Sequence, residues 1–172
     1  MRKNTKPTQK ILVVGAGLAG ATLARELADA NWEVDVIDKR DHIAGNAYDY
    51  VNEFGFRIHK YGPHLFHTDN ERVFNWLSRF TQWVPYRHKV KALLSDGSYV
   101  TLPPNRETKE ILGENVIDIL FRPYTRKMWG MELEEVDPKI LQRIKIRDDE
   151  NDLYFPNDRY QYLPRDGYTS MV

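Results

Sequence analysis

The chain has 172 residues, of which 25 are basic and 25 acidic, and it contains no cysteine. The balanced charge gives no electrostatic reason to expect nucleic acid as a partner. The absence of cysteine excludes disulfide bonds, thiolate metal sites and a cysteine nucleophile. No apolar stretch reaches the length of a membrane span, so we expect a cytoplasmic protein whose chemistry comes from other groups.

The first elements form a continuous pattern after residues 1–9, which we expect to be a basic, flexible tail. Ile11 to Val14 are large aliphatics, typical of a strand buried on both faces. Gly15, Gly17 and Gly20 follow in G-x-G-x-x-G spacing, which suits a tight turn, close approach of a pyrophosphate and close packing of a helix. Residues 18–30 are mostly helix formers, and Asn31 is a plausible helix stop.

A second strand, Val34 to Ile37, leads into Asp38. A carboxylate there can accept hydrogen bonds from a ribose diol and would repel a 2′-phosphate. A βαβ unit without a ligand is the alternative, but strand, glycines, helix, strand and acid in this order favour a dinucleotide. Spacing alone leaves NAD and FAD open. The next residues, KRDHIAGNA with Gly45, resemble the second turn of FAD-binding Rossmann proteins, and this resemblance indicates FAD.

Beyond residue 67 the alternation gives way to a mixture of helices and antiparallel strands. The capping-box spacing of Thr68 and Glu71 predicts a helix through Phe80. Asp96–Gly97 predicts the turn of a β-hairpin. Further elements are predicted at four places: a helical segment from Val116 to Phe121, a short helix beginning at Asp137–Pro138, a strand from Ile144 to Ile146, and a helix capped by Thr169 or Ser170.

Six pieces of the sequence, in this order, resemble the UDP-galactopyranose mutase family: GAGLAGA, DKRDHIAGNAYD, IHKYGPHLFHT, PYTRKMWG, IKIRDD and NDRYQYLPRDGYT. The resemblance spans nearly the whole chain. It implies an α/β fold, in which a Rossmann-like FAD-binding βαβ domain carries inserted helical and antiparallel β segments for the substrate. It assigns residues 10–67 to FAD and residues 68–172 to the substrate.

The activity that the resemblance implies is an isomerisation. A member of this family interconverts UDP-galactopyranose and UDP-galactofuranose in bacterial cell-wall galactofuranose biosynthesis. N5 of the reduced FAD attacks the anomeric carbon, so that no side-chain nucleophile is expected. The resemblance further implies a cytoplasmic homodimer without nucleic acid, membrane span or metal.

The site residues that the resemblance implies fall into two groups. The FAD contacts are expected at Gly15, Gly17, Leu18, Gly20, Asp38, Lys39, Gly45, Asn46, His64 and Leu65. The substrate contacts are expected at His88, Tyr124, Thr125, Trp129, Arg147 and Tyr160. His64 and Arg147 are expected nearest the chemistry, and the guanidinium of Arg147 suits bidentate pairing with the substrate diphosphate.

Structural roles are the alternatives for several of these residues. A tyrosine and a tryptophan on a helix more often belong to a core. A histidine in an ordered loop can simply satisfy backbone groups. The His64–His67 pair has metal-ligand character, but no third ligand is nearby.

The chain departs from the family pattern in length and at single positions. The family's chains are roughly twice as long, so we expect an N-terminal part that is truncated and inactive alone. Between Leu102 and Val116 the chain is shorter than the family's helical domain, which brings the mobile substrate lid into question. Pro123 and Ala44 stand where glycines are usual. An amine-oxidase-like flavoprotein and a non-catalytic truncated remnant are the two other functions left open.

Overall fold

The computed structural model describes residues 9–141 and 146–172. The predicted strand from Ile144 to Ile146 lies mostly outside the described residues. The chain forms two compact units: unit 1 comprises Met1–Tyr86 with Tyr160–Val172, and unit 2 comprises Arg87–Arg159. The predicted boundary at residue 67 separates an FAD region from a substrate region and does not coincide with the boundaries of the two compact units. This functional division stays a prediction.

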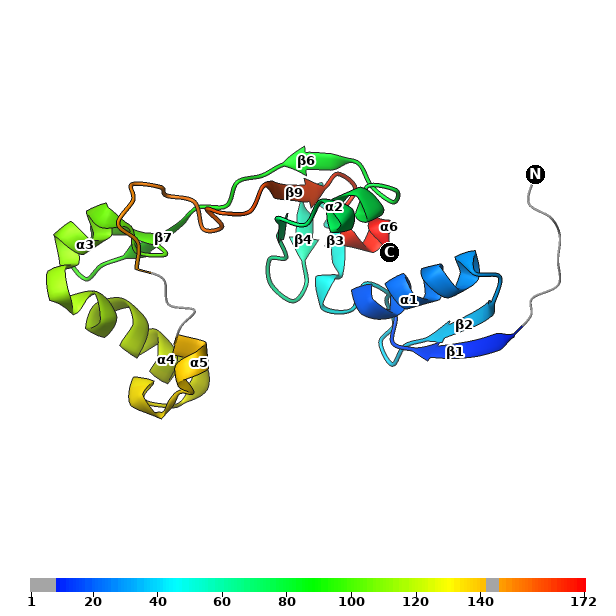
Figure 1. The fold of residues 1–172 in the computed structure, drawn as a ribbon, viewed down its shortest axis with the longest axis horizontal. Helices are drawn as coiled ribbons and strands as arrows, with labels where there is room; N and C mark the ends of the chain where they lie inside the picture. The colour runs from blue at the N-terminus through cyan, green and yellow to red at the C-terminus, as the bar shows by residue number, and fades with distance from the viewer. Residues whose placement is uncertain (1–8, 142–145) are drawn as a thin grey trace. The chain divides into compact units, whose positions relative to one another are not determined.

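Unit 1 begins with the predicted βαβ arrangement, which is confirmed. Strand β1 (Lys10–Val14) pairs in parallel with β2 (Glu33–Ile37), and helix α1 (Leu18–Asp29) connects them. Helix α1 lies along one face of the strand pair (Figure 1). The expectation of burial on both faces is wrong for the described chain, because Val13 is buried whereas Val14 is 76% exposed. With two strands and one helix, only one face of the pair is covered.

A second part of unit 1 is built from antiparallel strands. Strands β3 (Asp49–Val51) and β4 (Arg57–His59) form a hairpin after the short turn η1 (Gly45–Ala47). A three-stranded sheet follows in the order β5-β9-β6. Its strands are β5 (Phe66–Thr68), β9 (Tyr160–Pro164) and β6 (Trp83–Pro85). Strand β9 therefore brings the end of the chain between two strands from its first half.

Aromatic side chains pack this sheet against helix α2 (Glu71–Leu77). Phe74 of α2 stacks on Tyr160 with ring centroids 4.2 Å apart, and Phe66 stacks on Trp83 at 4.6 Å. Stacked aromatic pairs add stability beyond the area that they bury. The sheet and α2 thus share one aromatic cluster.

The predicted capping box of α2 is wrong. Asn70 caps the helix, since its side chain accepts hydrogen bonds from the backbone N–H groups of Arg72 and Val73. Thr68 belongs to β5, and its hydroxyl accepts from the N–H of Asn70. The helix ends at Leu77 rather than at Phe80. Asn70 caps the helix in place of Thr68 because it directly precedes the first helical residue. From there its side chain reaches two backbone N–H groups that have no partner within the helix.

The last helix of the described chain, α6 (Tyr168–Met171), is held by a residue 119 positions earlier. The buried carboxylate of Asp49 accepts from the N–H groups of Tyr168 and Thr169 at 2.8 and 2.9 Å. Gly167 precedes the helix with φ +86°. The prediction that Thr169 or Ser170 caps this helix is therefore wrong, because a carboxylate from β3 takes the capping role.

Unit 2 combines a hairpin with a run of short helices. The predicted hairpin is confirmed by β7 (Val90–Leu93) and β8 (Tyr99–Leu102), with Gly97 at φ +86° in the turn. The helical elements are α3 (Arg106–Leu112), η2 (Gly113–Asn115), the π-helical η3 (Ile117–Phe121), α4 (Arg122–Trp129), η4 (Leu133–Glu135) and α5 (Pro138–Leu141). The predicted helix starts near Val116 and at Pro138 are confirmed. Val100, Leu112 and Val116 form the core.

We predict that Asp49→Asn destabilises the full chain by about 1.5–3 kcal/mol, because the buried N–H donors lose a charged acceptor. The midpoint of urea unfolding measures this loss. Asp69→Asn is the matched control, since Asp69 is exposed. Equal stability of Asp49→Asn and Asp69→Asn would contradict the capping role.

Candidate functional site

The glycine turn between β1 and α1 has the geometry expected of a dinucleotide cradle. Gly15 has φ +110°, a conformation that L side chains rarely adopt. Gly17 lies against Gly45, and a Cβ added at Gly45 would be 3.0 Å from the Gly17 Cα. The N–H of Ala44 donates to the Ala16 carbonyl at 2.8 Å. Two predicted cofactor loops therefore meet backbone to backbone.

Gly20 has a different role from the other two glycines. A Cβ at this position would lie 1.8 Å from the carbonyl oxygen of Gly15. No side chain fits there, because the first turn of α1 packs directly on the end of β1. Gly20 therefore serves helix packing, whereas Gly17 has only an ordinary contact at 3.7 Å.

Asp38 lies at the end of β2, beside the glycine turn. Its carboxylate accepts from the N–H of Arg40 at 2.8 Å and from the N–H of Ala16 at 2.6 Å. These two bonds, that of Arg40 first, lower the pKa of Asp38, so the group is ionised at neutral pH. A carboxylate offers about four acceptor positions. Two positions thus remain for the hydroxyls of a ribose.

The other predicted cofactor residues near this turn are exposed. Leu18 begins α1, and Lys39 follows Asp38. Asn46 uses its side-chain oxygen to accept from the Arg40 guanidinium at 2.8 Å. The structure thus brings the glycines and Asp38 together and sets Asn46 to hold Arg40.

Arg40 is a residue of this site for which the sequence predicted no role, and Ala44 was noted only as a departure from the usual glycine. Ala44 is buried and has a left-handed backbone with φ +67°. A signal was present, because Ala44 stands where a second glycine is usual. Arg40 carried no comparable signal.

His64 and Leu65 lie in the loop before β5. The N–H of His64 donates to Nδ1 of His59 at 3.2 Å, and His64 Nδ1 lies 3.0 Å from the Gly62 carbonyl oxygen. Burial lowers the pKa of His59 and so favours the neutral ring, which has one nitrogen able to accept this hydrogen bond. Leu65 is half-buried. Within residues 9–141 and 146–172, no group of three or more metal-ligating side chains includes His64 or His67.

Helix α4 carries three of the predicted substrate residues. Tyr124 is 59% exposed and Trp129 is 48% exposed, so neither belongs to the core of unit 2. Five positions correspond to about 140° around an α-helix, so these two rings leave the helix in different directions. The hydroxyl of Thr125 donates to the Phe121 carbonyl at 2.8 Å.

Arg147 is the most unusual of the predicted substrate residues. Its side chain is only 10% exposed, and Nη2 donates to the carbonyl oxygen of Asn151. The buried Nε and Nη1 atoms have no hydrogen-bond partner in the described chain, and Asp149 is 3.8 Å from Nη1. Buried donors without partners cost free energy, and an anionic ligand would satisfy them.

His88 and Tyr160 lie in different units. The ring of His88 lies 5.6 Å from that of Tyr154 in unit 2. Tyr160 is buried in the aromatic cluster of unit 1. The predicted cofactor residues and Tyr160 thus belong to unit 1, and the other predicted substrate residues belong to unit 2. Their functional roles stay predictions.

The class of protein follows from unit 1. A parallel strand pair, a glycine turn and a carboxylate after the second strand make a Rossmann-like dinucleotide-binding fold. The family model described as "NAD(P)-binding Rossmann-like domain" matches residues 13–80. The model described as "UDP-galactopyranose mutase" matches residues 119–172, which include α4, Arg147 and β9.

Curated relatives extend this similarity to nearly the whole chain. A probable UDP-galactopyranose mutase of Klebsiella pneumoniae is 34% identical, with 95% of this chain and 52% of the relative covered. A dTDP-fucopyranose mutase of Escherichia coli is 35% identical, with 94% and 52% covered. The UDP-galactopyranose mutase of Mycoplasma genitalium is 33% identical, with 93% and 49% covered. The resemblance to UDP-galactopyranose mutases that the motifs predicted is confirmed.

The extent of the match is also informative. The chain spans about half the length of the curated relatives it matches. The alignment with the Klebsiella protein runs over 201 residues, more than the 172 of this chain, so the relative carries residues without a counterpart here.

A solved structure supports the fold independently. The crystal structure of reduced UDP-galactopyranose mutase matches with a TM-score of 0.64 at 19% identity, over 95% of this chain and 45% of that one. The predicted fold class is confirmed. None of the described helices combines the length and apolar character that a bilayer crossing requires.

We predict that two glycine substitutions separate packing from ligand contact in the full chain. Gly20→Ala should cost about 2–3 kcal/mol of stability, because the new methyl group meets a fixed backbone oxygen. Gly17→Ala should leave stability unchanged within about 1 kcal/mol, because its space and backbone conformation accept a methyl group. Gly17→Ala should nevertheless reduce the amount of dinucleotide that the chain retains, because the methyl group would lie where the pyrophosphate is expected to approach the backbone.

Urea unfolding measures the stability of both variants. Chromatography of the nucleotide released by heat, after gel filtration, measures retention. Full retention by Gly17→Ala would contradict a ligand contact at the second glycine, and a stable Gly20→Ala would contradict the packing role.

Proposed function

We propose that this chain supplies the cofactor site and part of the substrate site of a flavin-dependent mutase that interconverts UDP-galactopyranose and UDP-galactofuranose. One structural observation carries the proposal. Arg147, in the segment matched by the mutase family model, is a buried guanidinium with two unsatisfied donor atoms. A substrate diphosphate has the charge and the oxygen geometry to satisfy them.

FAD is the cofactor in this proposal. The close contact of Gly17 with Gly45 leaves backbone free of side chains for a pyrophosphate, and ionised Asp38 keeps acceptor positions for a ribose. Leu18, Lys39, Asn46, His64 and Leu65 complete the predicted contacts. The chemistry that reduced FAD supplies when bound is a nucleophilic nitrogen, N5, for the anomeric carbon of the sugar.

The residues of the chain bind and orient in this scheme. Arg147 neutralises the diphosphate, which is also the leaving group, so it stabilises the charge that grows there. Tyr124 and Trp129 offer exposed rings for the nucleotide and the sugar. Thr125, His88 and Tyr160 are the remaining predicted contacts. His64 lies in a loop fixed by His59.

A second nucleotide sugar is a specific alternative. The similarity to the dTDP-fucopyranose mutase is as high as that to the UDP-galactopyranose mutases. Both named substrates are pyranose sugars on a nucleoside diphosphate, so Arg147 would serve either. The match over residues 119–172 supports a mutase rather than an amine-oxidase-like flavoprotein.

The proposal also covers organisation and setting. Residues 10–67 form the FAD region and residues 68–172 the substrate region. Activity requires the further segments that the relatives possess, and the active form is a cytoplasmic homodimer in cell-wall galactofuranose biosynthesis.

The direct test is turnover by a protein in which this chain is continued by the segments that the relatives possess, with bound, dithionite-reduced flavin. UDP-galactofuranose is offered, and conversion to the pyranose is followed by chromatography. dTDP-fucofuranose is offered in parallel to decide between the two nucleotide sugars. We expect turnover of the UDP sugar that requires reductant; conversion of neither sugar would contradict the proposed function.

We predict that Arg147→Ala weakens UDP binding by about 1.5–3 kcal/mol, which is the usual cost of losing hydrogen bonds to a charged group. The UDP affinity of Arg147→Lys should lie between those of Arg147→Ala and the unsubstituted protein, because lysine keeps the charge but lacks the forked donors of a guanidinium. Stability without ligand should stay within about 1 kcal/mol, because the substitution also removes an incompletely satisfied buried charge.

Isothermal titration with UDP measures the affinity, and urea unfolding measures the stability. Arg72→Ala on the exposed side of α2 is the matched control. Unchanged UDP affinity in Arg147→Ala would remove this arginine from the site.

A further inference from the structure

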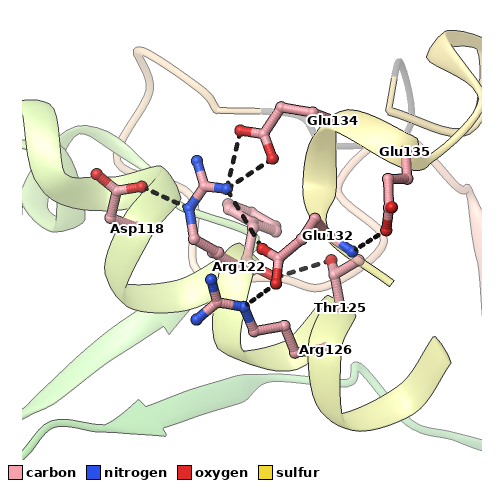
Figure 2. A network of polar contacts seen from close by, with 8 residues as sticks. Asp118, Arg122, Thr125, Arg126, Glu132, Glu134 and Glu135 are labelled. Carbon is pink, nitrogen blue, oxygen red and sulfur yellow. Dashed lines mark hydrogen bonds and ion pairs between the residues drawn. The ribbon is translucent and has the colours of Figure 1, made fainter. Parts of the chain in front are cut away.

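Arg122, at the start of α4, is enclosed by carboxylates. Its Nε atom donates to Asp118 at 3.0 Å, and Nη1 lies 2.8 Å from Glu134. A carboxylate oxygen of Glu132 is 3.9 Å from Nη1. Figure 2 shows these three acidic side chains converging on one guanidinium.

Arg126, one turn further along α4, is held by the same group. Its Nε atom donates to Glu132 at 2.7 Å. This hydrogen bond, together with the charge of Arg122, lowers the pKa of Glu132. The backbone of Glu132 is fixed in turn, because its N–H donates to Glu135 at 2.7 Å in a capping box (Figure 2).

The balance of charge in this network decides what its arginines can do. Asp118, Glu132 and Glu134 carry three negative charges against the two positive charges of Arg122 and Arg126. A phosphate brought to either guanidinium would meet this negative surplus, and at Arg122 it would also compete with hydrogen bonds already formed. The occupied donors of Arg122 and the negative charge around Arg126 therefore disfavour an anion at this side of α4.

Lys127 is the third cation of α4, and it lies on another side of the helix. It follows Arg126 by one residue, which turns it about 100° away from the network. It lies three positions after Tyr124, so these two side chains are neighbours on the helix surface. Lys127 and Tyr124 are both exposed, and the described part of the chain provides Lys127 with no carboxylate partner.

We propose that Lys127 is the residue of α4 that contacts the diphosphate of the nucleotide, beside Tyr124. The inference rests on the proposed function and adds a phosphate-contacting residue to it. The ligand class is a nucleoside diphosphate or its sugar ester. The carboxylate network fixes the opposite side of α4, so that the helix presents one exposed cation and one aromatic ring together.

The test compares UDP with uridine on the full chain by isothermal titration. Lys127→Gln should weaken UDP binding about fivefold, because a charged contact to phosphate is lost, and should leave uridine binding unchanged. Lys127→Arg should retain UDP affinity. The loss should shrink as salt is raised, because ions screen an exposed charge pair.

Lys139→Gln is the matched control, since Lys139 is an exposed lysine of the same unit. Equal UDP affinity of Lys127→Gln and the unsubstituted protein would overturn the inference. An equal loss for UDP and uridine would also overturn it, because the phosphates would then not be involved. Failure of the unsubstituted protein to bind UDP at all would instead contradict the proposed function.

Discussion

A buried carboxylate holds unit 1 together. Asp49 follows the second cofactor loop closely, and it binds the N-terminus of the last helix through two backbone N–H groups. Nη1 of Arg57 lies 3.7 Å from Oδ1 of Asp49. Gly167 packs closely on the same carboxylate, since a Cβ at this position would be 2.4 Å from Oδ2 of Asp49. The loop at Gly45 is thereby tied to a helix far away in the sequence. This interaction and the Ala44–Ala16 hydrogen bond together fix the position of the loop.

Arginines of unit 2 divide into two kinds according to how fully they are satisfied. Arg122 has three carboxylates around it, and such a group serves structure, because any ligand must displace existing bonds. Arg147 is buried, and two of its donor atoms have no hydrogen-bond partner in the described chain. An anion that bonded to these atoms would remove the cost of leaving them unsatisfied. The same residue type therefore has opposite uses, and the number of partners distinguishes them.

Local sequence predicted the features that depend on local geometry. The turn at Gly15 and the position of Asp38 at the end of β2 were predicted, because glycine spacing and strand length determine both within one βαβ unit. The residues that cap α2 and α6 were not predicted correctly. Thr68 and Glu71 have the spacing of a capping box, but Asn70 directly precedes the helix, and asparagine is itself a preferred N-cap residue. The capping of α6 by Asp49 could not be predicted, because tertiary packing brings the two segments together.

The path of the chain through unit 1 has a consequence for tolerance to insertion. Unit 2 is the segment of the chain between β6 and β9. These two strands pair directly: Pro85 lies opposite Tyr162, and the N–H of Tyr86 donates to the carbonyl of Gln161. The two junctions are thus adjacent within one sheet. A segment joined at neighbouring points can be lengthened, shortened or exchanged without moving the strands that carry it. The length of unit 2 can therefore change while β6 and β9 stay paired.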